Sequence, residues 1–235
     1  MSPSDFEPGE YARNILSRPT DRDQQVKIGA SNLSNMCSRC LADDMTSAGG
    51  SVSSPYWLGA TIGTAVHAYL DERNDDPDAL KEFKVTIGEI EGYGVVRSTS
   101  DLFHIPSGTV CDWKTTVRDK LVYIKRALLE EQHDLEATKT AAMRHKVSGY
   151  VNQIMLYGLG MENAGYEVKR VSLGFVCRDG KGDADIWGWS TEYDREHALK
   201  VFDRGARLWA WLQEGHTPDE LPSAYHCWAC SMRRE

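Results

Sequence analysis

A tight turn between two β-forming runs is the feature that most restricts how this chain can fold. The turn is Pro106-Ser107-Gly108, and the runs on either side of it are 94–105 and 109–115. Proline and glycine suit the backbone angles of a tight turn, so the segment predicts an antiparallel hairpin. Asp101 and Asp112 stand a few residues from the turn on opposite strands. We therefore expect their carboxylates to lie close together.

The second strand of this hairpin carries two opposite charges. Residues two apart on a strand point to the same face, so Asp112 and Lys114 project together while Trp113 is predicted to face the other way, into the core. With Asp101, they place two carboxylates and one ammonium in one pocket. Carboxylates are ligands that Mg2+ prefers, and a divalent ion there can polarise a phosphodiester and generate a hydroxide nucleophile. The lysine can orient water or stabilise negative charge that grows on phosphorus.

Hydrophobic spacing predicts the remaining elements. Apolar residues at three- and four-residue steps predict helices at 30–45, 57–73, 118–132, 139–163 and 194–214. Alternating and β-branched runs predict strands at 83–90, 94–105, 109–115, 167–177 and 184–191. This order indicates an α/β fold with a mixed central sheet flanked by helices. Residues 1–28, with three prolines and many charges, are predicted to form a loosely attached arm, and 29–235 a single domain.

Length and composition agree with one ordinary globular domain. The 235 residues are 41% hydrophobic and 26% charged, which suffices for one sizeable core. No stretch reaches the roughly 18 consecutive apolar residues of a membrane span, and the first residues lack the basic and apolar regions of a signal peptide. We therefore expect a cytoplasmic protein that does not act at a membrane.

The cysteines divide into two groups. Four of the six form Cys-x-x-Cys pairs near the two ends of the sequence: Cys37, Cys40, Cys227 and Cys230. In a reducing compartment such pairs are more often metal or cluster ligands than disulfides. Two Cys-x-x-Cys pairs are also a common zinc pattern. Cys111 and Cys177 lie singly in apolar runs and are predicted to pack in the core.

Charge is unevenly distributed along the chain. The net charge of -8 argues against a protein that coats nucleic acid through bulk electrostatics. Residues 71–91 carry eight acidic and three basic side chains, whereas 114–146 carry eight basic and five acidic ones. A local basic face is one interpretation of the second segment, and solvated helix surfaces are the other.

The hairpin segment SDLFHIPSGTVCDWKTT resembles the core of the PD-(D/E)XK nuclease superfamily. In this comparison Asp101 matches the first acidic residue, and Asp112 and Lys114 match the D-x-K element. A same-face ion pair without catalytic meaning is the structural alternative for the last two residues. The resemblance implies a metal-dependent nuclease with a restriction-endonuclease-like sheet.

Two helical segments extend the resemblance to the RecB-type branch of this superfamily. IGTAVHAYLDE is similar to the branch's G-x-x-x-H helix, with Gly63 and His67 in the matching positions. YVNQIMLYGLG is similar to its Q-x-x-x-Y motif, which places Gln153 and Tyr157 one helical turn apart on the same face. Both segments stand in the expected order around the hairpin.

The paired cysteines carry the third part of the resemblance. RecB-type nucleases with an iron-sulfur cluster, including CRISPR adaptation nucleases and AddB-type helicase-nucleases, have one cysteine before the histidine motif and three after the Q-x-x-x-Y motif. Cys37, Cys227 and Cys230 match three of these four, the last C-terminal cysteine is missing, and Cys40 is additional. The resemblance implies a 4Fe-4S cluster that joins the two ends of the domain, with structural Zn2+ as the alternative.

The resemblance also implies roles for individual residues. One Mg2+ or Mn2+ would be held by His67, Asp101, Asp112 and, through its main-chain carbonyl, Trp113. Lys114 would position the attacking water, and Gln153 and Tyr157 would contact DNA or orient the lysine. The implied activity is that of an exonuclease acting on DNA ends or single-stranded DNA. Its setting would be phage or prokaryotic recombination, repair or replication, with proteins of those processes as partners and, for a phage protein, in the host cytoplasm.

Basic residues after the hairpin are candidates for contact with DNA. Arg118, Lys120, Lys125 and Arg126 could follow the backbone of a single strand, and Tyr123 could stack on a base. No G-x-x-x-x-G-K-[ST] pattern occurs, so we expect a nuclease module without a helicase motor. The alternative function is a DNA-binding or assembly module that does not cut and that keeps a structural zinc or iron-sulfur site.

Overall fold

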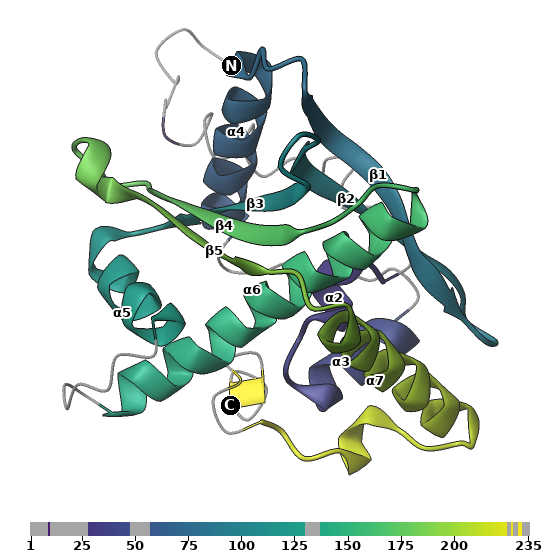
Figure 1. Ribbon diagram of the computed structural model, residues 1–235. Coiled ribbons are helices and arrows are strands. Elements are labelled where there is room, and N and C mark those ends of the chain that lie inside the picture. The colour runs from purple at the N-terminus through teal and green to yellow at the C-terminus, as the bar shows by residue number, and fades with distance from the viewer. Residues whose placement is uncertain are drawn as a thin grey trace, which may run out of the picture.

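A mixed sheet of five strands forms the centre of the molecule. The computed structural model describes residues 28–47, 57–129 and 137–224, together with Gly9, Cys227, Cys230 and Ser231 (Figure 1). The strands lie side by side in chain order: β1 Ala79–Ile90, β2 Gly94–His104, β3 Thr109–Thr116, β4 Arg170–Cys177 and β5 Ile186–Glu192. β3 and β4 are parallel, and the other neighbours are antiparallel. The predicted mixed sheet and its β2-β3 hairpin are thus confirmed.

Helices cover both faces of this sheet. Their bounds are α2 Ala30–Leu33, α3 Ser38–Thr46, α4 Trp57–Arg73, α5 Arg118–Leu128, α6 Ala137–Asn163 and α7 Arg195–Gln213, with two 3-10 turns, η3 Asp183–Asp185 and η4 Pro218–Glu220. A parallel strand pair needs a long crossover, which α5 and α6 provide between β3 and β4. Figure 1 shows α6 running diagonally across one face, while α4 stands on the other beside β3. The active-site motifs predicted on α4 and α6 therefore approach the sheet from opposite sides.

The position of α6 depends on close contact with its neighbours. A Cβ atom added to Gly160 would lie 2.6 Å from Val85 Cγ2 on β1, and one added to Gly158 would lie 2.5 Å from Tyr193 Cε2. Real Cβ atoms do not approach other carbons this closely, because interiors are packed to crystal-like density. The two glycines thus let the helix backbone approach β1 and Tyr193, which fixes the height of its other side chains above the sheet.

Some predictions fall outside the described part of the chain. Apart from Gly9 and Ile28, the predicted arm at 1–28 lies outside it, as do residues 130–132 at the end of the helix predicted at 118–132. Within the described residues, no helix combines the length and apolar character that crossing a membrane requires.

The single helix predicted at 30–45 is wrong, because two helices with a break between them occupy this segment. α2 ends at Leu33, and α3 begins after Cys37, whose N-H donates to the Asn35 side chain. The guanidinium of Arg204 on α7 donates through Nη2 to the carbonyl oxygens of Leu33, at 2.7 Å, and of Asn35. Carbonyls left open at a helix end need such partners. The break is therefore set by a residue on α7 that local periodicity does not reveal.

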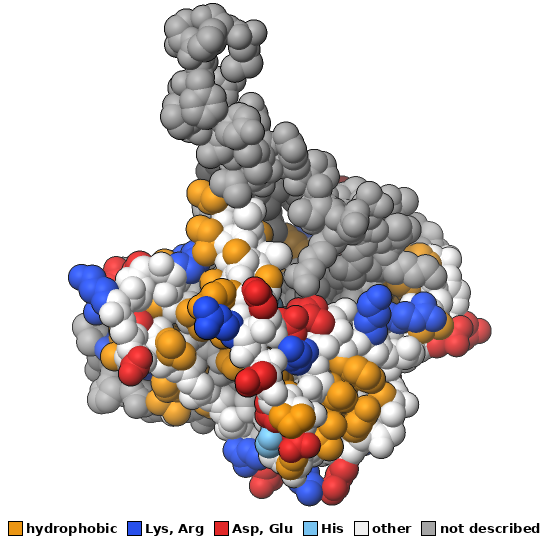
Figure 2. All heavy atoms as spheres, turned by 90° about the horizontal axis from the view of Figure 1, so that it is seen from above, with side chains coloured by type: hydrophobic (Ala, Val, Ile, Leu, Met, Phe, Trp, Pro, Cys, Tyr) orange, Lys and Arg blue, Asp and Glu red, His pale blue; other side chains and the backbone are white. Residues whose placement is uncertain are grey.

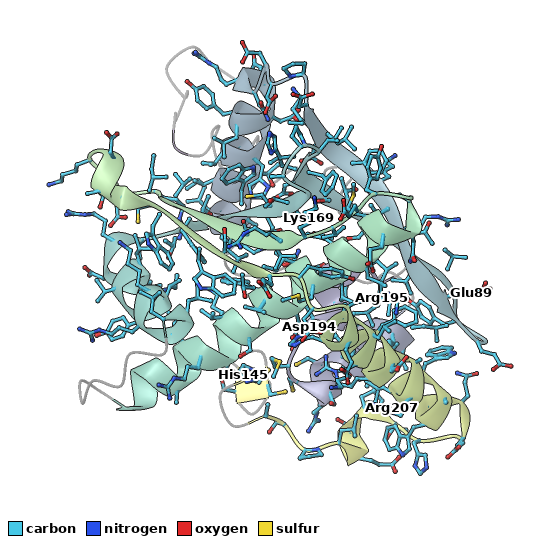
Figure 3. The ribbon with its side chains drawn as sticks, in the orientation of Figure 1. Glu89, His145, Lys169, Asp194, Arg195 and Arg207 are labelled. Carbon is cyan, nitrogen blue, oxygen red and sulfur yellow. The ribbon has the colours of Figure 1, made fainter. Side chains whose placement is uncertain are left out.

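We expect Arg204→Gln to lower the free energy of unfolding by about 2 kcal/mol, because hydrogen bonds to a charged donor each contribute roughly 1.5–3 kcal/mol. Arg207 on the same helix is exposed (Figure 3), so Arg207→Gln serves as the control and should change stability by less than about 0.5 kcal/mol. Urea unfolding monitored by circular dichroism measures both. Equal effects of the two substitutions would contradict the role of Arg204 at the break.

Candidate active site and cysteine site

The candidate active site lies where β2 and β3 separate. Within these described strands, backbone pairing ends at Leu102 and Cys111, one residue short of Asp101 and Asp112. Beyond that point the Asp101 carboxylate accepts a 2.8 Å hydrogen bond from the Trp113 N-H. A side chain thus takes the place of a carbonyl partner on the neighbouring strand. The opening lets groups from both faces of the sheet reach one another.

A chain of polar contacts runs from β3 to α6. Lys114 Nζ lies 2.6 Å from Asp112 Oδ2, and it donates to Gln153 Oε1 at 2.9 Å. Gln153 Nε2 in turn donates to the Tyr157 hydroxyl at 2.7 Å. Asp112 is only 2% exposed, and a buried carboxylate requires such a partner. The structure therefore brings together the four predicted residues of this group, with the lysine at its centre.

Burial and charge act in opposite directions on this pair. Burial raises the pKa of the Asp112 carboxyl above its usual range, although attraction to Lys114 opposes the shift. For Lys114, burial alone would lower the pKa, but Asp112 reverses the effect and raises it. Lys114 is therefore an ammonium at neutral pH, which suits it to orient water and stabilise negative charge rather than to remove a proton.

His67 reaches the same site from α4. Its Nδ1 lies 3.3 Å from Asp101 Oδ2, and the hydrogen bond with Asp101 raises the pKa of the imidazole. Gly63, one turn earlier, faces Thr115 of β3: a Cβ there would lie 3.3 Å from Oγ1. The glycine thus permits the close approach of α4 to β3. The predicted histidine and first aspartate are neighbours in the structure.

Glu82 is a residue of this site that the sequence analysis missed. Donor atoms of His67, Glu82 and Asp101 all lie within 4.8 Å of one another. The same three residues help to line a cavity of about 270 Å³. Trp113, which lies on the opposite side of β3 from Lys114, also lines this cavity. Trp113 is half-buried there against Gly174 rather than deep in the core. The predicted strand began at residue 83, whereas β1 begins at Ala79. Glu82 therefore lay outside the predicted strand and was not considered as a site residue.

The predicted DNA-contacting residues lie along α5, outside the polar chain. Arg118 forms an ion pair with Asp185 at 2.9 Å, so its charge already has a partner. Lys120 is exposed, and Tyr123 is half-buried. The two remaining candidates, Lys125 and Arg126, form cation-π contacts: Lys125 lies over the Trp187 ring and Arg126 over the Tyr123 ring.

A cation that the sequence analysis did not single out, Lys146, shares an aromatic ring with Lys114. Lys146 of α6 lies over the Tyr150 ring at 5.7 Å, and Lys114 lies over the same ring at 5.0 Å. Burial, then repulsion from Arg178 and Lys114, lowers the pKa of Lys146. Mutual repulsion of this kind is relieved when an anion binds. We call Lys114, Lys146 and Arg178 the basic cluster. These residues are therefore more direct candidates for phosphate contact than the residues of α5.

The four paired cysteines meet in a second site. Sγ-Sγ distances are 3.6 Å for Cys37-Cys230 and 3.4 Å for both Cys40-Cys227 and Cys40-Cys230. All four sulfurs lie within 4.8 Å of one another. The site joins α3 to the segment after η4, in agreement with the prediction that it connects distant parts of the sequence. Cys111 and Cys177 are buried elsewhere.

The thiols of this site differ in acidity. Burial raises the pKa of Cys40, and it raises that of Cys230 to about 11. For Cys37, burial acts in the same direction, but backbone hydrogen bonds with Ala224 and Cys40 lower its pKa to about 7. Because a metal binds thiolates, loading this site must release the protons of Cys40 and Cys230.

Comparison with known proteins places the fold. No protein-family model matches the chain, and no curated protein matches it in sequence. Among solved structures, an alkaline exonuclease (LHK-Exo) from Laribacter hongkongensis matches with a TM-score of 0.51 and 11% identity, over 83% of this chain and 94% of the other. The chain has an exonuclease-like fold. LHK-Exo in complex with dAMP matches with a TM-score of 0.50 and 12% identity, over 82% of this chain and 90% of that one.

The exonuclease-like fold agrees with the fold class predicted from the sequence. Identities of 11% and 12% carry no information about individual side chains. The assignment of the two sites therefore rests on the geometry described above.

We expect Cys40→Ser and Cys227→Ser to lose the metal of the cysteine site and to lower the thermal unfolding midpoint by on the order of 10 °C, because metal binding and folding are coupled. Cys177→Ala is the control and should retain the metal. Metal analysis of protein purified without oxygen, with thermal unfolding, provides the test. Wild-type protein that holds no metal would refute the site.

Proposed function

We propose that this protein is a Mg2+- or Mn2+-dependent deoxyribonuclease that degrades DNA from its ends or as a single strand. The observation that carries the proposal is the arrangement of Asp101, Asp112 and Lys114 at the opening between β2 and β3. A buried carboxylate and ammonium pair beside a second carboxylate is expensive to desolvate, which favours a functional reason for its presence. The exonuclease-like fold and the complex of LHK-Exo with dAMP support a DNA substrate.

The residues of the site fit a divalent ion. Carboxylate oxygens, a carbonyl and one imidazole make a donor set that Mg2+ and Mn2+ accept. The proposed ligands are His67, Asp101, Asp112 and the carbonyl of Trp113. An ion bound there would polarise a phosphodiester and lower the pKa of bound water.

Lys114 has the central part among the protein groups. As an ammonium it can hold the attacking water and stabilise charge on the phosphoryl oxygens during in-line hydrolysis. Gln153 accepts from Lys114, and its hydrogen bond to Tyr157 fixes the amide in place. We therefore propose that Gln153 and Tyr157 orient the lysine, and that contact with DNA is secondary for them.

Single-stranded DNA would lie across the basic groups beside the site. Lys146 and Arg178 are proposed to contact phosphates nearest to Lys114, and Arg118, Lys120 and Tyr123 phosphates and bases further along α5. The acidic net charge makes this a local contact that salt weakens. Participation in phage or prokaryotic recombination, repair or replication stays a prediction, as does a cytoplasmic location.

For the cysteine site, the sulfur spacing favours one metal ion. Four thiolates at about 2.3 Å from a tetrahedral Zn2+ stand about 3.8 Å apart. The observed separations of 3.4 and 3.6 Å are close to this value. In a 4Fe-4S cluster each thiolate binds a different iron, which requires wider spacing. We propose structural Zn2+ ahead of the 4Fe-4S cluster that the resemblance implied.

The substitution Lys114→Met tests the proposed function. We expect degradation of end-labelled single-stranded DNA with Mg2+ or Mn2+ to fall at least about 100-fold, because removing one charge-stabilising donor typically costs 10²–10³ in rate. The exposed Lys169 on the loop before β4 (Figure 3) supplies the control, Lys169→Met, which should retain full activity. Thermal unfolding verifies that both variants are folded.

The outcomes separate the candidate functions. Loss of cutting in a folded Lys114→Met protein supports the nuclease. Wild-type protein that binds DNA and does not cut it with either ion would refute the nuclease and favour the binding module.

Binding measurements test the basic cluster. We expect Lys146→Gln to weaken binding of single-stranded DNA by several-fold and to reduce the slope of log affinity against log salt by about 0.7, since each phosphate contact contributes about that amount for a single strand. Lys169→Gln should change neither quantity. Fluorescence anisotropy at several salt concentrations, in Ca2+ to prevent cutting, measures both. An unchanged slope for Lys146→Gln would place the DNA elsewhere.

A further inference from the structure

A second cavity lies between α5, α6, β5 and the first turn of α7. Its volume is about 540 Å³, twice that of the cavity beside His67. Pockets that hold small molecules measure roughly 300–1,000 Å³, so this one is large enough for a ligand. None of its described lining residues has a part in the proposed mechanism.

The cavity follows two neighbouring rows of side chains on α6. Val147 and Val151 form an apolar row, and Arg144, Ser148 and Asn152 form a polar row beside it. Residues four apart on a helix lie one above the other, which explains why each row lines the cavity along its length. From its first to its last residue the polar row extends over roughly 12 Å of the helix axis. The two ends of a ligand can therefore meet different side chains.

An aromatic side chain belongs to the apolar part of the lining. Trp189 of β5 and Leu128 of α5 both line the cavity. Trp189 packs against the core but is only half-buried, because part of its side chain faces the cavity. Aromatic side chains bind nucleobases by stacking, since every base has a flat π-face. An indole among aliphatic side chains thus suits a flat ring of a ligand.

The charge of the lining favours an anion. Arg144 is a cation, and no acidic side chain occurs among the described lining residues. Asp194, which caps α7, is not one of them, and its carboxylate accepts a 2.9 Å hydrogen bond from the His197 N-H. The face that Figure 2 shows differs, because acidic and basic side chains lie close together there. A guanidinium pairs well with phosphate, and Ser148, one turn along α6, adds a hydroxyl donor.

His197 is held at the other end of the polar row by a buried amide. Asn152 is 7% exposed, and its Oδ1 lies 2.7 Å from His197 Nε2. The Asn152 Nδ2 donates to the carbonyl oxygen of Ser34 and to Met36 Sδ, which turns the amide oxygen towards the imidazole. Nε2 is then the donor of this pair, and Nδ1 is the second polar atom of the ring. The imidazole is therefore oriented before a ligand arrives.

We propose that this cavity binds a nucleotide, with the phosphate at Arg144 and Ser148, the base against Trp189, and His197 in contact with the sugar or base. We call it the nucleotide cavity. The choice of a nucleotide among aromatic anions rests on the proposed function, because hydrolysis of DNA from an end releases mononucleotides. A free mononucleotide and the end of a DNA strand offer the same chemistry to these residues.

Isothermal titration calorimetry of the full-length protein with dAMP, in buffer without added divalent ions, tests the proposal. We expect Arg144→Gln to weaken binding at least about 10-fold, since hydrogen bonds to charged groups are among the strongest. Trp189→Leu should weaken it at least about fivefold through loss of stacking. Arg207→Gln is the matched control, because Arg207 is exposed on α7 (Figure 3).

Two further ligands sharpen the assignment. Deoxyadenosine, which lacks the phosphate, should bind wild type and Arg144→Gln equally, whereas a general disturbance of the fold would weaken both ligands. A short single-stranded oligonucleotide distinguishes the sources of the nucleotide. Weaker oligonucleotide binding by Arg144→Gln assigns the cavity to the end of a strand, and a loss confined to dAMP assigns it to the free mononucleotide.

Two results would overturn the proposal. One is that Arg144→Gln and Trp189→Leu bind both dAMP and the oligonucleotide as tightly as wild type. The other is loss of dAMP binding in Lys114→Met with none in Arg144→Gln, which would place the nucleotide in the candidate active site. Thermal unfolding checks each variant, and the exposed Arg144 carries the test if Trp189→Leu does not fold.

Parallel DNA-degradation assays separate this test from that of the proposed function. If wild type cuts DNA and neither variant weakens nucleotide binding, the nucleotide cavity is refuted and the nuclease stands. If wild type cuts no DNA with either ion, the nuclease is refuted, and the titrations still decide whether the cavity binds a nucleotide.

Discussion

The hydrogen bond from the Trp113 N-H to the Asp101 carboxylate is the contact on which the architecture of the active site depends. In a regular hairpin this N-H would have a main-chain acceptor on β2. Here a carboxylate accepts it at 2.8 Å, and strand pairing stops one residue earlier. The sheet consequently opens without leaving a buried donor unpaired, which would cost on the order of 1–3 kcal/mol. An aspartate thus has both a structural and a chemical task at this point.

The opening explains how groups from opposite faces of the sheet come together. Asp112 and Lys114 face α6 and meet Gln153, whereas His67 reaches Asp101 from α4 on the other side. Closely packed glycines let both helices approach, Gly63 on α4 and Gly160 on α6. The rigidity of these contacts matters because catalytic groups must be held to within a fraction of an ångström. The helices therefore act as fixed supports for a site located within the sheet.

Much of this arrangement could be predicted because it depends on local regularity. The turn at 106–108 set the hairpin, and the two-residue period of a strand placed Asp112 and Lys114 together. The one-turn spacing of Gln153 and Tyr157 likewise follows from helix geometry, and their 2.7 Å hydrogen bond agrees with it. These relations involve neighbours in the sequence, and their geometry follows from secondary structure without knowledge of the tertiary fold.

What could not be predicted depends on partners far along the chain or on departures from regularity. The break between α2 and α3 is stabilised by Arg204, 171 residues after Leu33. Glu82 reaches the site because β1 is irregular at this residue. A prediction that assumes regular alternation of side chains along a strand cannot identify such a position. Lys146 became notable only when folding placed it beside Tyr150 and Lys114. Such features are typical of sites where function overrides local preference.

The cysteine site has a further consequence for the mechanics of the domain. Its sulfurs connect residues separated by as many as 193 positions, Cys37 and Cys230, so a metal held there closes most of the chain into a ring. Peripheral segments are usually where a domain begins to fray. While the metal joins them, neither α3 nor the segment after η4 can detach from the domain alone. Opening of the molecule must then begin at an internal loop or wait until the ring itself is broken.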